Sequence, residues 1–365
     1  MKKLLYITNG INGAAGLERV LSVKASYLAD KLNYEVHILT LNNGNTNLFY
    51  EFSDKIIHHN IQVSGNPIHY VKSYLSGIKS IVKQLNPNII LVCDDGLKAF
   101  FLPLFLSKKI PLIYERHVSK NIVFAQNSGI IDKLKANIQF GLMNFLAPKF
   151  KKFVVLTEEN RKEWKSKNVV VISNPLSFYP NENSSLQNKK VIAVGKQSHQ
   201  KGYDRLLQSW KIVIEKHPDW QLEIYGKFDA NQKLDELATQ LEIKNNILFF
   251  EPIANIEQKY LESSIYAMSS RYEGFGMVLI EAMACGVPCV SFNCPYGPSD
   301  IIEDKIDGFL VNNDDYKAFA NKLILLIENK ELRDMMGKNA KENVKRFLPE
   351  VILQQWDELF KSLIK

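Results

Sequence analysis

Hydrophobic and polar positions in the first half of the chain alternate between short apolar runs and longer amphipathic stretches. The runs have the length and continuous hydrophobicity of buried parallel strands, and the stretches have helical spacing. The predicted strands are 4–8, 36–41, 89–93, 112–114, 154–156 and 169–172, and the predicted helices are 18–32, 68–85 and 97–106. This alternation predicts an α/β fold with a doubly wound parallel sheet, whose ligands bind at the carboxyl ends of the strands.

The second half repeats the alternation after a polar stretch. Its predicted strands are 191–194, 222–225, 247–250, 265–269 and 288–292, and its predicted helices are 203–215, 234–241, 277–284, 315–328, 331–346 and 349–364. A length of 365 residues also favours two domains of ordinary size. The predicted organisation is a first domain over 1–175, a linker over 176–189, a second domain over 190–347 and a final segment over 348–365.

The composition is that of an ordinary soluble globular protein, with 46% hydrophobic and 23% charged residues. No apolar run is long enough to cross a bilayer, and the start lacks the hydrophobic region and cleavage site of a signal peptide. We therefore expect a cytoplasmic protein. The net charge of +7 favours contact with phosphates. Nucleic acid is disfavoured as a partner because the aromatic residues lie mainly within apolar core runs.

Two groups of residues invite a metal-site interpretation. Cys285, Cys289 and Cys294 are close in sequence but have no neighbouring His, so buried thiols are favoured over a zinc site. Asp94 and Asp95 could hold a divalent cation, but they lack the spacer of a DxD motif. Because strand ends often carry turn-forming Asp, a structural or solvated role is favoured for this pair.

The most informative stretch is 271–292, RYEGFGMVLIEAMACGVPCVSF. Glu273 and Glu281 bracket a glycine loop and the first turns of a predicted helix. Gly274 and Gly276 have no β-carbon, so a ligand can approach their N–H groups closely. The N-terminal end of a helix suits a phosphate or sugar oxygen. The alternative is one exposed loop carboxylate and one solvated helix carboxylate.

The spacing of Glu273 and Glu281, with seven residues between them, resembles the E-x7-E motif of the retaining GT-B glycosyltransferases, most closely family 4. The resemblance extends along nearly the whole chain. It implies two facing Rossmann-like, doubly wound domains with the active site in the cleft between them. It also implies a final segment that crosses back onto the first domain, and no requirement for a metal or another cofactor.

In the first domain the resemblance covers the loop over 9–19 and the segment Tyr-Glu-Arg-His that ends at His117. The glycines of the loop, including Gly16, do not have the GxGxxG spacing of a dinucleotide site. The loop is similar to the family's glycine loop, which faces the sugar nucleotide and the acceptor, although Ala15 stands where glycine is common. The resemblance implies that His117 contacts the donor sugar, whereas the residues alone allow a local hydrogen-bonding role.

In the second domain the segment 195–204 resembles the family's G-R-x-x-x-x-K-G, whose two basic residues hold the donor diphosphate. Lys201 matches directly, whereas Lys196 replaces the usual Arg and lacks its bidentate fork. Fixed cations would stabilise the charge that the leaving diphosphate gains. Without the neighbouring motif, two solvated loop lysines would be favoured.

The resemblance also implies a role for each residue of the glutamate motif. Glu281 would accept hydrogen bonds from the ribose hydroxyls, and Glu273 would orient the transferred sugar. The backbone N–H groups of Gly274, Phe275 and Gly276 would contact that sugar. The predicted catalytic residues are Glu273, His117 and Lys201. No protein nucleophile is evident, and retention follows if the acceptor attacks the face from which the diphosphate leaves.

The substrate prediction rests on residues 294–302, CPYGPSDII, which resemble enzymes that transfer galactose or related hexoses in bacterial cell-surface polysaccharides. We expect a UDP-linked donor of galactose, N-acetylgalactosamine or glucose. The expected acceptor is a lipid-linked oligosaccharide or surface polysaccharide, such as O-antigen, capsule or lipopolysaccharide. The alternatives are a GDP-mannose-dependent mannosyltransferase, a nucleotide-sugar epimerase and a non-catalytic partner that binds sugar nucleotide or polysaccharide.

The segment 130–153 places apolar residues between five lysines. An amphipathic basic segment of this kind can rest on the anionic inner face of the cell membrane, which would suit a lipid-linked acceptor. The alternative is a helix that faces the core and has a solvated basic face.

Overall fold

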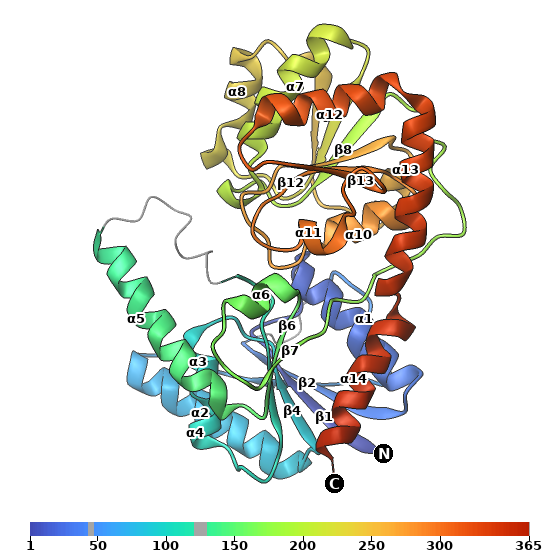
Figure 1. Ribbon diagram of the computed structural model, residues 1–365. Coiled ribbons are helices and arrows are strands. Elements are labelled where there is room, and N and C mark those ends of the chain that lie inside the picture. The colour runs from blue at the N-terminus through green and yellow to red at the C-terminus, as the bar shows by residue number, and fades with distance from the viewer. Residues whose placement is uncertain (43–46, 120–129, 365) are drawn as a thin grey trace. The chain divides into compact units, whose positions relative to one another are not determined.

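The structure, a computed structural model, describes residues 1–42, 47–119 and 130–364, and the side chains of 130–133 are not considered. The chain forms two compact units (Figure 1). The first contains a seven-stranded sheet and the closing segment from Pro349, and the second spans Phe178–Leu348 and contains a six-stranded sheet. Each unit has its own hydrophobic core, formed by apolar strands and the inner faces of the helices.

The strand order of the first sheet is β3-β2-β1-β4-β5-β6-β7, and its paired strands are parallel. The strands are β1 (Lys2–Ile7), β2 (Tyr34–Leu41), β3 (Ile57–Ile61), β4 (Ile89–Val92), β5 (Leu112–Glu115), β6 (Lys152–Val155) and β7 (Val169–Val171). The order reverses between β1 and β4, which is the place where doubly wound sheets bind ligands. The predicted doubly wound architecture is therefore confirmed for this unit.

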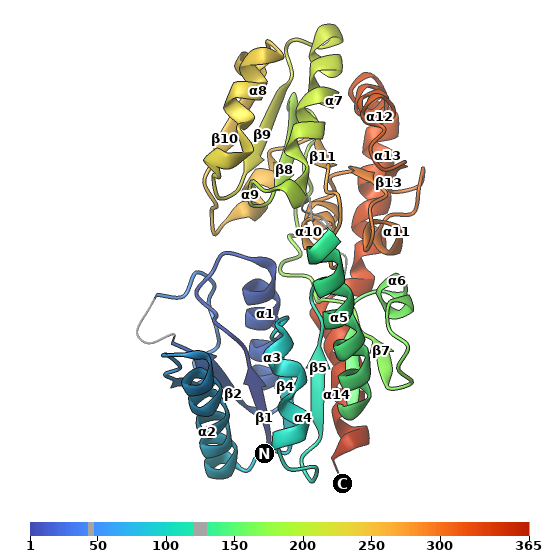
Figure 2. The ribbon, with the colours of Figure 1, turned by 90° about the vertical axis from the view of Figure 1, so that its left-hand side faces the viewer.

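Helices cover both faces of the first sheet. They are α1 (Gly16–Asp30), α2 (Pro67–Leu85), α3 (Leu97–Phe100), α4 (Leu102–Phe105), α5 (Ile130–Leu146), α6 (Glu158–Lys162) and α14 (Pro349–Leu363). The inner side chains of α2, α3 and α5 enter one core cluster with the strands. The closing helix α14 packs beside α1 (Figures 1 and 2). It is anchored to β2 by a hydrogen bond of 2.7 Å from the Tyr34 hydroxyl to Asp357 Oδ1.

The second sheet has the order β10-β9-β8-β11-β12-β13, also with parallel pairs. Its strands are β8 (Lys190–Val194), β9 (Gln221–Tyr225), β10 (Ile247–Phe250), β11 (Ile265–Met268), β12 (Cys289–Phe292) and β13 (Gly308–Val311). Its helices are α7 (Tyr203–Lys216), α8 (Leu234–Gln240), α9 (Ile256–Leu261), α10 (Met277–Ala284), α11 (Pro298–Ile301), α12 (Tyr316–Glu328) and α13 (Lys330–Asn343). This order reverses between β8 and β11, so the predicted architecture is confirmed here as well.

The structure differs from the sequence prediction at several elements. β3 was not predicted, because Ile57–Ile61 reads IHHNI and lies at the edge of its sheet, largely accessible to solvent. The predicted helix 97–106 is divided into α3 and α4, with a proline in the first turn of α4. The predicted linker, 176–189, is not a free connection: from Phe178 onwards it belongs to the second unit, where Ser184 is buried and its hydroxyl donates to Ser263 O at 2.6 Å.

The basic segment 130–153 is divided among three elements. Helix α5 ends at Leu146, a 3₁₀ turn spans Ala147–Lys149, and Lys152 already belongs to β6. Three of its five lysines therefore lie beyond the helix. Within the described residues, none of the helices is long and apolar enough to cross a membrane.

Candidate functional site

The loops that follow β8 and β11 bring two predicted site residues together. These strands are neighbours at the switch point of the second sheet, so their carboxyl ends lie side by side. Lys201 Nζ donates to Glu273 Oε1 at 2.8 Å, and the Ser270 hydroxyl donates to the same oxygen at 2.6 Å. The two charged side chains are only 17% and 9% exposed. Because both charged groups are largely buried, the alternative of solvated loop residues is wrong for this pair. Charged groups at a switch point are also suited to polar ligand groups.

Two glycines make this close packing feasible. Gly202 has a φ of +62°, and a β-carbon there would lie 2.3 Å from Ser269 O. A β-carbon at Gly195 would lie 2.5 Å from the Cε of Lys201. The lysine side chain therefore lies directly against the backbone of its own loop. The glycines of this segment serve to bring Lys201 close to β11 and Glu273.

The two glycines of the glutamate motif differ in backbone conformation. Gly276 has a φ of +102° and immediately precedes α10, whereas Gly274 is not among the residues with positive φ. The Phe275 side chain is 3% exposed and packs edge-on against Phe347. A β-carbon at Gly297 would lie 1.8 Å from Phe275 O. Since the Phe275 side chain is core, only its backbone remains a candidate for contact with a ligand.

Glu281 lies within α10 and is 3% exposed. The Tyr260 hydroxyl, from α9, donates to Glu281 Oε2 at 3.3 Å. A solvated helix carboxylate, the alternative considered from the sequence, is therefore wrong for this residue. Lys196 lies in the loop after β8 with an exposed side chain. It is close to Lys201 along the chain but is not part of the ion pair with Glu273.

His117 and Gly16 lie in the first unit. The His117 backbone N–H donates to Asp95 Oδ1 at 3.2 Å, and its ring Nε2 lies 3.5 Å from Glu115 Oε2. Gly16 is exposed as the first residue of α1, and a β-carbon there would meet nothing within 4 Å. Sterics alone thus do not require glycine at this position. The predicted roles of His117 and Gly16 in donor binding stay predictions.

A buried charge cluster next to His117 was missed from the sequence. Lys24 Nζ, from α1, lies 2.6 Å from Glu115 Oε2, and the side chains are 2% and 3% exposed. Burial alone would raise the pKa of Glu115, but Lys24 and His117 outweigh it and hold that pKa below its ordinary value. Candidate ligand atoms of Cys93, Glu115 and His117 also lie within 4.8 Å of one another. The Lys24 ammonium group already contacts Glu115 and offsets its negative charge. The carboxylate of this cluster therefore does not need a metal ion to balance its charge.

The other candidate metal residues have structural roles. Cys285, Cys289 and Cys294 are buried thiols, as predicted. Asp94 Oδ1 accepts hydrogen bonds from Asn9 at 3.0 Å and from the Gly96 backbone at 2.8 Å. Asp94 therefore shapes the turn after β4, in agreement with the structural role favoured from the sequence.

Sequence reasoning also missed Arg271 and Asp204, which join the same two loops that carry Glu273 and Lys201. The Arg271 guanidinium donates to Asp204 Oδ1 at 2.8 Å and to Asp204 Oδ2 at 2.5 Å. Both residues stand next to motif residues, but their pairing spans 67 positions. The sequence offers one indication of a role for them, which is that both residues lie next to the motif segments that follow β8 and β11.

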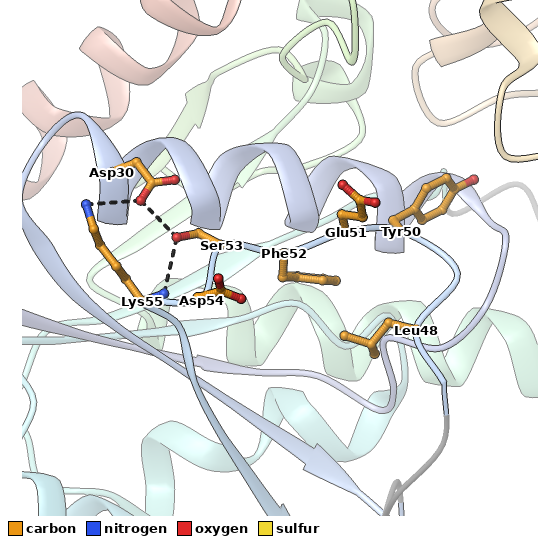
Figure 3. A pocket seen from close by; sticks show the side chains of 8 residues that line it. All are labelled: Asp30, Leu48, Tyr50, Glu51, Phe52, Ser53, Asp54 and Lys55. Atoms are coloured by element: carbon orange, nitrogen blue, oxygen red, sulfur yellow. Dashed lines mark hydrogen bonds and ion pairs between the residues drawn. The ribbon is translucent and has the colours of Figure 1, made fainter.

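A pocket of about 590 Å³ opens in the first unit, and its lining includes none of the predicted site residues (Figure 3). It is lined by Asp30, Leu48 and the segment 50–55. Asp30 Oδ1 accepts a hydrogen bond from the Ser53 hydroxyl at 2.8 Å and lies 3.2 Å from Lys55 Nζ. The Asp30 carboxylate is thus already engaged by its neighbours, and we assign no ligand to this pocket.

Known proteins of similar sequence match nearly the whole chain. The profile of the family described as glycosyl transferases group 1 matches residues 178–343. An uncharacterized glycosyltransferase of Haemophilus influenzae is 31% identical, over 98% of this chain and 99% of its own length. The amylovoran biosynthesis glycosyltransferase AmsD of Erwinia amylovora is 30% identical over the same shares. Among solved structures, Anabaena HepE in complex with UDP and glucose has a TM-score of 0.79 at 18% identity, covering 98% of this chain and 99% of its own.

The fold of HepE agrees with the two parallel-sheet units described above, and the two relatives match over 99% of their own length. The range of residues that the family profile matches includes Lys201, Glu273 and Glu281. The chain therefore belongs to the glycosyl transferases group 1 family and is a glycosyltransferase with the GT-B fold.

Proposed function

We propose that the protein is a retaining glycosyltransferase of family 4 that moves a hexosyl unit from a UDP-sugar to a lipid-linked oligosaccharide or surface polysaccharide. The observation that carries this proposal is the pairing of Lys201 with Glu273 at the switch point of the second sheet. A fixed cation there offsets the negative charge that the diphosphate gains as the glycosidic bond breaks. The adjacent carboxylate can accept hydrogen bonds from sugar hydroxyls.

The remaining roles follow from the chemistry of each group. Glu281 accepts hydrogen bonds from the ribose, and Lys196 shares the diphosphate with Lys201. The N–H groups of 274–276 and the His117 side chain contact the transferred sugar. The acceptor hydroxyl attacks the face from which the diphosphate departs, so the anomeric configuration is retained.

The donor and acceptor in this proposal draw on the similar proteins. HepE was solved with UDP and glucose, which supports a UDP-linked hexose as donor. AmsD is named for the biosynthesis of amylovoran, which supports a polysaccharide product. We therefore favour galactosyl, N-acetylgalactosaminyl or glucosyl transfer during the assembly of a surface polysaccharide.

The first test of this proposal is the release of nucleoside diphosphate from a panel of UDP-, GDP- and ADP-sugars. It is measured with and without extracted polyprenyl-linked oligosaccharide. We expect release from a UDP-hexose that depends on the acceptor and is lost in Glu281→Ala, because a buried ribose contact is removed. Nuclear magnetic resonance of the product should show the anomeric configuration of the donor.

Two further variants make that test specific. Glu281→Gln keeps the size of the side chain and should still lower release, whereas Glu236→Ala removes an exposed carboxylate of α8 and should not. Binding of the donor without release under any condition would contradict the transferase proposal and favour a non-catalytic binding partner.

Contact with the anionic inner face of the cell membrane is the second part of the proposal. Between residues 55 and 157 the chain has fourteen Lys and Arg residues and four Asp and Glu residues. This stretch is therefore more positive than the whole chain, whose net charge is +7. Anionic lipids attract each exposed basic residue that lies near the bilayer by about 1 kcal/mol.

The helices of this stretch also expose apolar side chains. Helices α2, α4 and α5 lie on the side of the first unit that faces the viewer in Figure 2. Seven large apolar residues of these helices are exposed: Ile68, Val71, Leu104, Phe105, Leu134, Ile138 and Phe145. Lys149 Nζ lies 5.1 Å from the centre of the Phe145 ring. Apolar side chains with adjacent ammonium groups suit the headgroup region of a membrane.

Vesicle binding tests the membrane contact. We expect the wild type to sediment with phosphatidylglycerol vesicles and not with phosphatidylcholine vesicles, with weaker binding as salt rises. The double variant Ile138→Ser, Phe145→Ser should bind about tenfold more weakly, because two apolar insertions are lost. The matched control is Leu248→Ser, Phe250→Ser, which removes exposed apolar residues from β10 in the second unit. An equal loss in both double variants would contradict a specific membrane face.

A further inference from the structure

Arg271 joins the loop that carries Lys201 to the loop that carries Glu273. Its guanidinium holds both oxygens of Asp204, at the start of α7, and also donates to His199 O at 2.9 Å. The Arg271 side chain is 22% exposed. A bidentate Arg–carboxylate pair fixes orientation as well as distance, because two parallel hydrogen bonds restrict rotation.

One backbone hydrogen bond and two side-chain-to-backbone hydrogen bonds connect the same two segments beside this ion pair. The Arg271 N–H donates to Gln200 O at 2.7 Å, and Gln200 Nε2 donates to Tyr272 O at 3.2 Å. The Ser269 hydroxyl donates to Lys201 O at 2.8 Å. The bonds therefore hold the main chain of Arg271 and Tyr272 and the side chain of Ser269, and they reach the carbonyl oxygen of Lys201 itself.

The Lys201 side chain depends on this arrangement for its position. Lysine has a flexible four-carbon stem, and holding its ammonium group at one point costs conformational entropy. Here the stem crosses Gly195, and the ammonium group reaches Glu273 at 2.8 Å. A small displacement of one loop would move the ammonium group away from the place where it meets a phosphate.

We propose that Arg271 and Asp204 are positioning residues, which hold Lys201 where it contacts the second phosphate of the donor nucleotide. This inference rests on the proposed function of Lys201 as a diphosphate ligand. Neither Arg271 nor Asp204 needs to touch the donor. Their effect reaches the ligand through Lys201, so it disappears when Lys201 is absent.

The test measures the affinity for a nucleoside diphosphate and for the matching monophosphate by titration calorimetry, using the base that the wild type binds best. Arg271→Lys keeps the positive charge but loses the bidentate fork. We expect it to weaken diphosphate binding about tenfold, the equivalent of one charge-assisted hydrogen bond. Monophosphate binding and the melting temperature should change little. In a Lys201→Ala background, Arg271→Lys should have almost no further effect, because contacting residues are not additive.

The controls separate this inference from the proposed function and from a general loss of structure. Asp204→Asn should reproduce the effect of Arg271→Lys, whereas Lys330→Ala, which removes the ion pair with Asp334 in α13, should not. Equal weakening of monophosphate and diphosphate binding, or full additivity with Lys201→Ala, would overturn the positioning role. If the wild type binds no nucleoside diphosphate, the proposed function itself fails. If the wild type binds and Arg271→Lys is unaffected, only the positioning role is refuted.

Discussion

Replacement of Lys201 by alanine is expected to lower turnover by roughly 10- to 200-fold, because one charge-assisted contact contributes about 1.5 to 3 kcal/mol. The structure places Lys201 Nζ 2.8 Å from Glu273 Oε1, at the carboxyl end of the neighbouring strand. The cation acts on charge that grows as the leaving diphosphate forms, so the loss should appear mainly in kcat.

Steady-state kinetics with saturating acceptor measures this effect, and a thermal melt confirms that the variant is folded. Lys201→Arg keeps the charge and should retain part of the activity. Lys189→Ala removes an exposed lysine that pairs with Asp219 in the same unit and should leave turnover unchanged. A decrease smaller than twofold in folded Lys201→Ala would contradict the assignment of this residue.

The architecture of both units could be predicted because buried parallel strands read as continuous apolar runs separated by amphipathic helices. Strand β13, which reads GFLV, carries that signal and was nevertheless not predicted, whereas two other parts of the fold lack it. The edge strand β3 carries two histidines and an asparagine, and the segment 176–189 is polar although it packs on the second unit. Polar composition does not distinguish a free linker from a segment whose polar groups find partners.

The candidate site shows the same limit. Lys201, Glu273 and Glu281 could be chosen as candidates because the resemblance fixes their spacing along the chain. Arg271 and Asp204 could not, since their contact depends on which strands become neighbours in the sheet. Pairings over such separations are a property of the topology, and a local pattern of residues does not determine them.

The buried Lys24 is the clearest case of a residue whose environment the sequence conceals. A lysine within an amphipathic helix is normally solvated. Here its ammonium group lies 2.6 Å from Glu115 Oε2 and 3.3 Å from the centre of the Trp356 ring of α14. The first sheet and the closing helix together surround this ion pair.

Glu115→Ala is expected to destabilise the first unit by about 3–5 kcal/mol, because it leaves a buried cation without its partner. His117 Nε2 lies 3.5 Å from the same carboxylate, so its ring should also lose its orientation. Because the pKa of Glu115 is held below its ordinary value, this stabilisation is present above the usual carboxyl range and is lost as pH falls through the lowered pKa. Hydrogen exchange of peptides that cover β1 and β5 measures the first unit separately from the second.

The double variant Lys24→Met, Glu115→Leu distinguishes two contributions to the stability of the first unit. One is the charge of the ion pair, and the other is the volume that its side chains fill. Well-packed apolar residues often replace a buried ion pair without loss, so the double variant should recover most of the stability that Glu115→Ala loses. Lys55→Ala is the matched control, since Lys55 and Asp30 are 64% and 37% exposed and their pairing contributes below about 1 kcal/mol. A change of less than about 1 kcal/mol in Glu115→Ala would mean that Lys24 is not held as a buried cation by this carboxylate. In that case the charge cluster would not stabilise the position of His117.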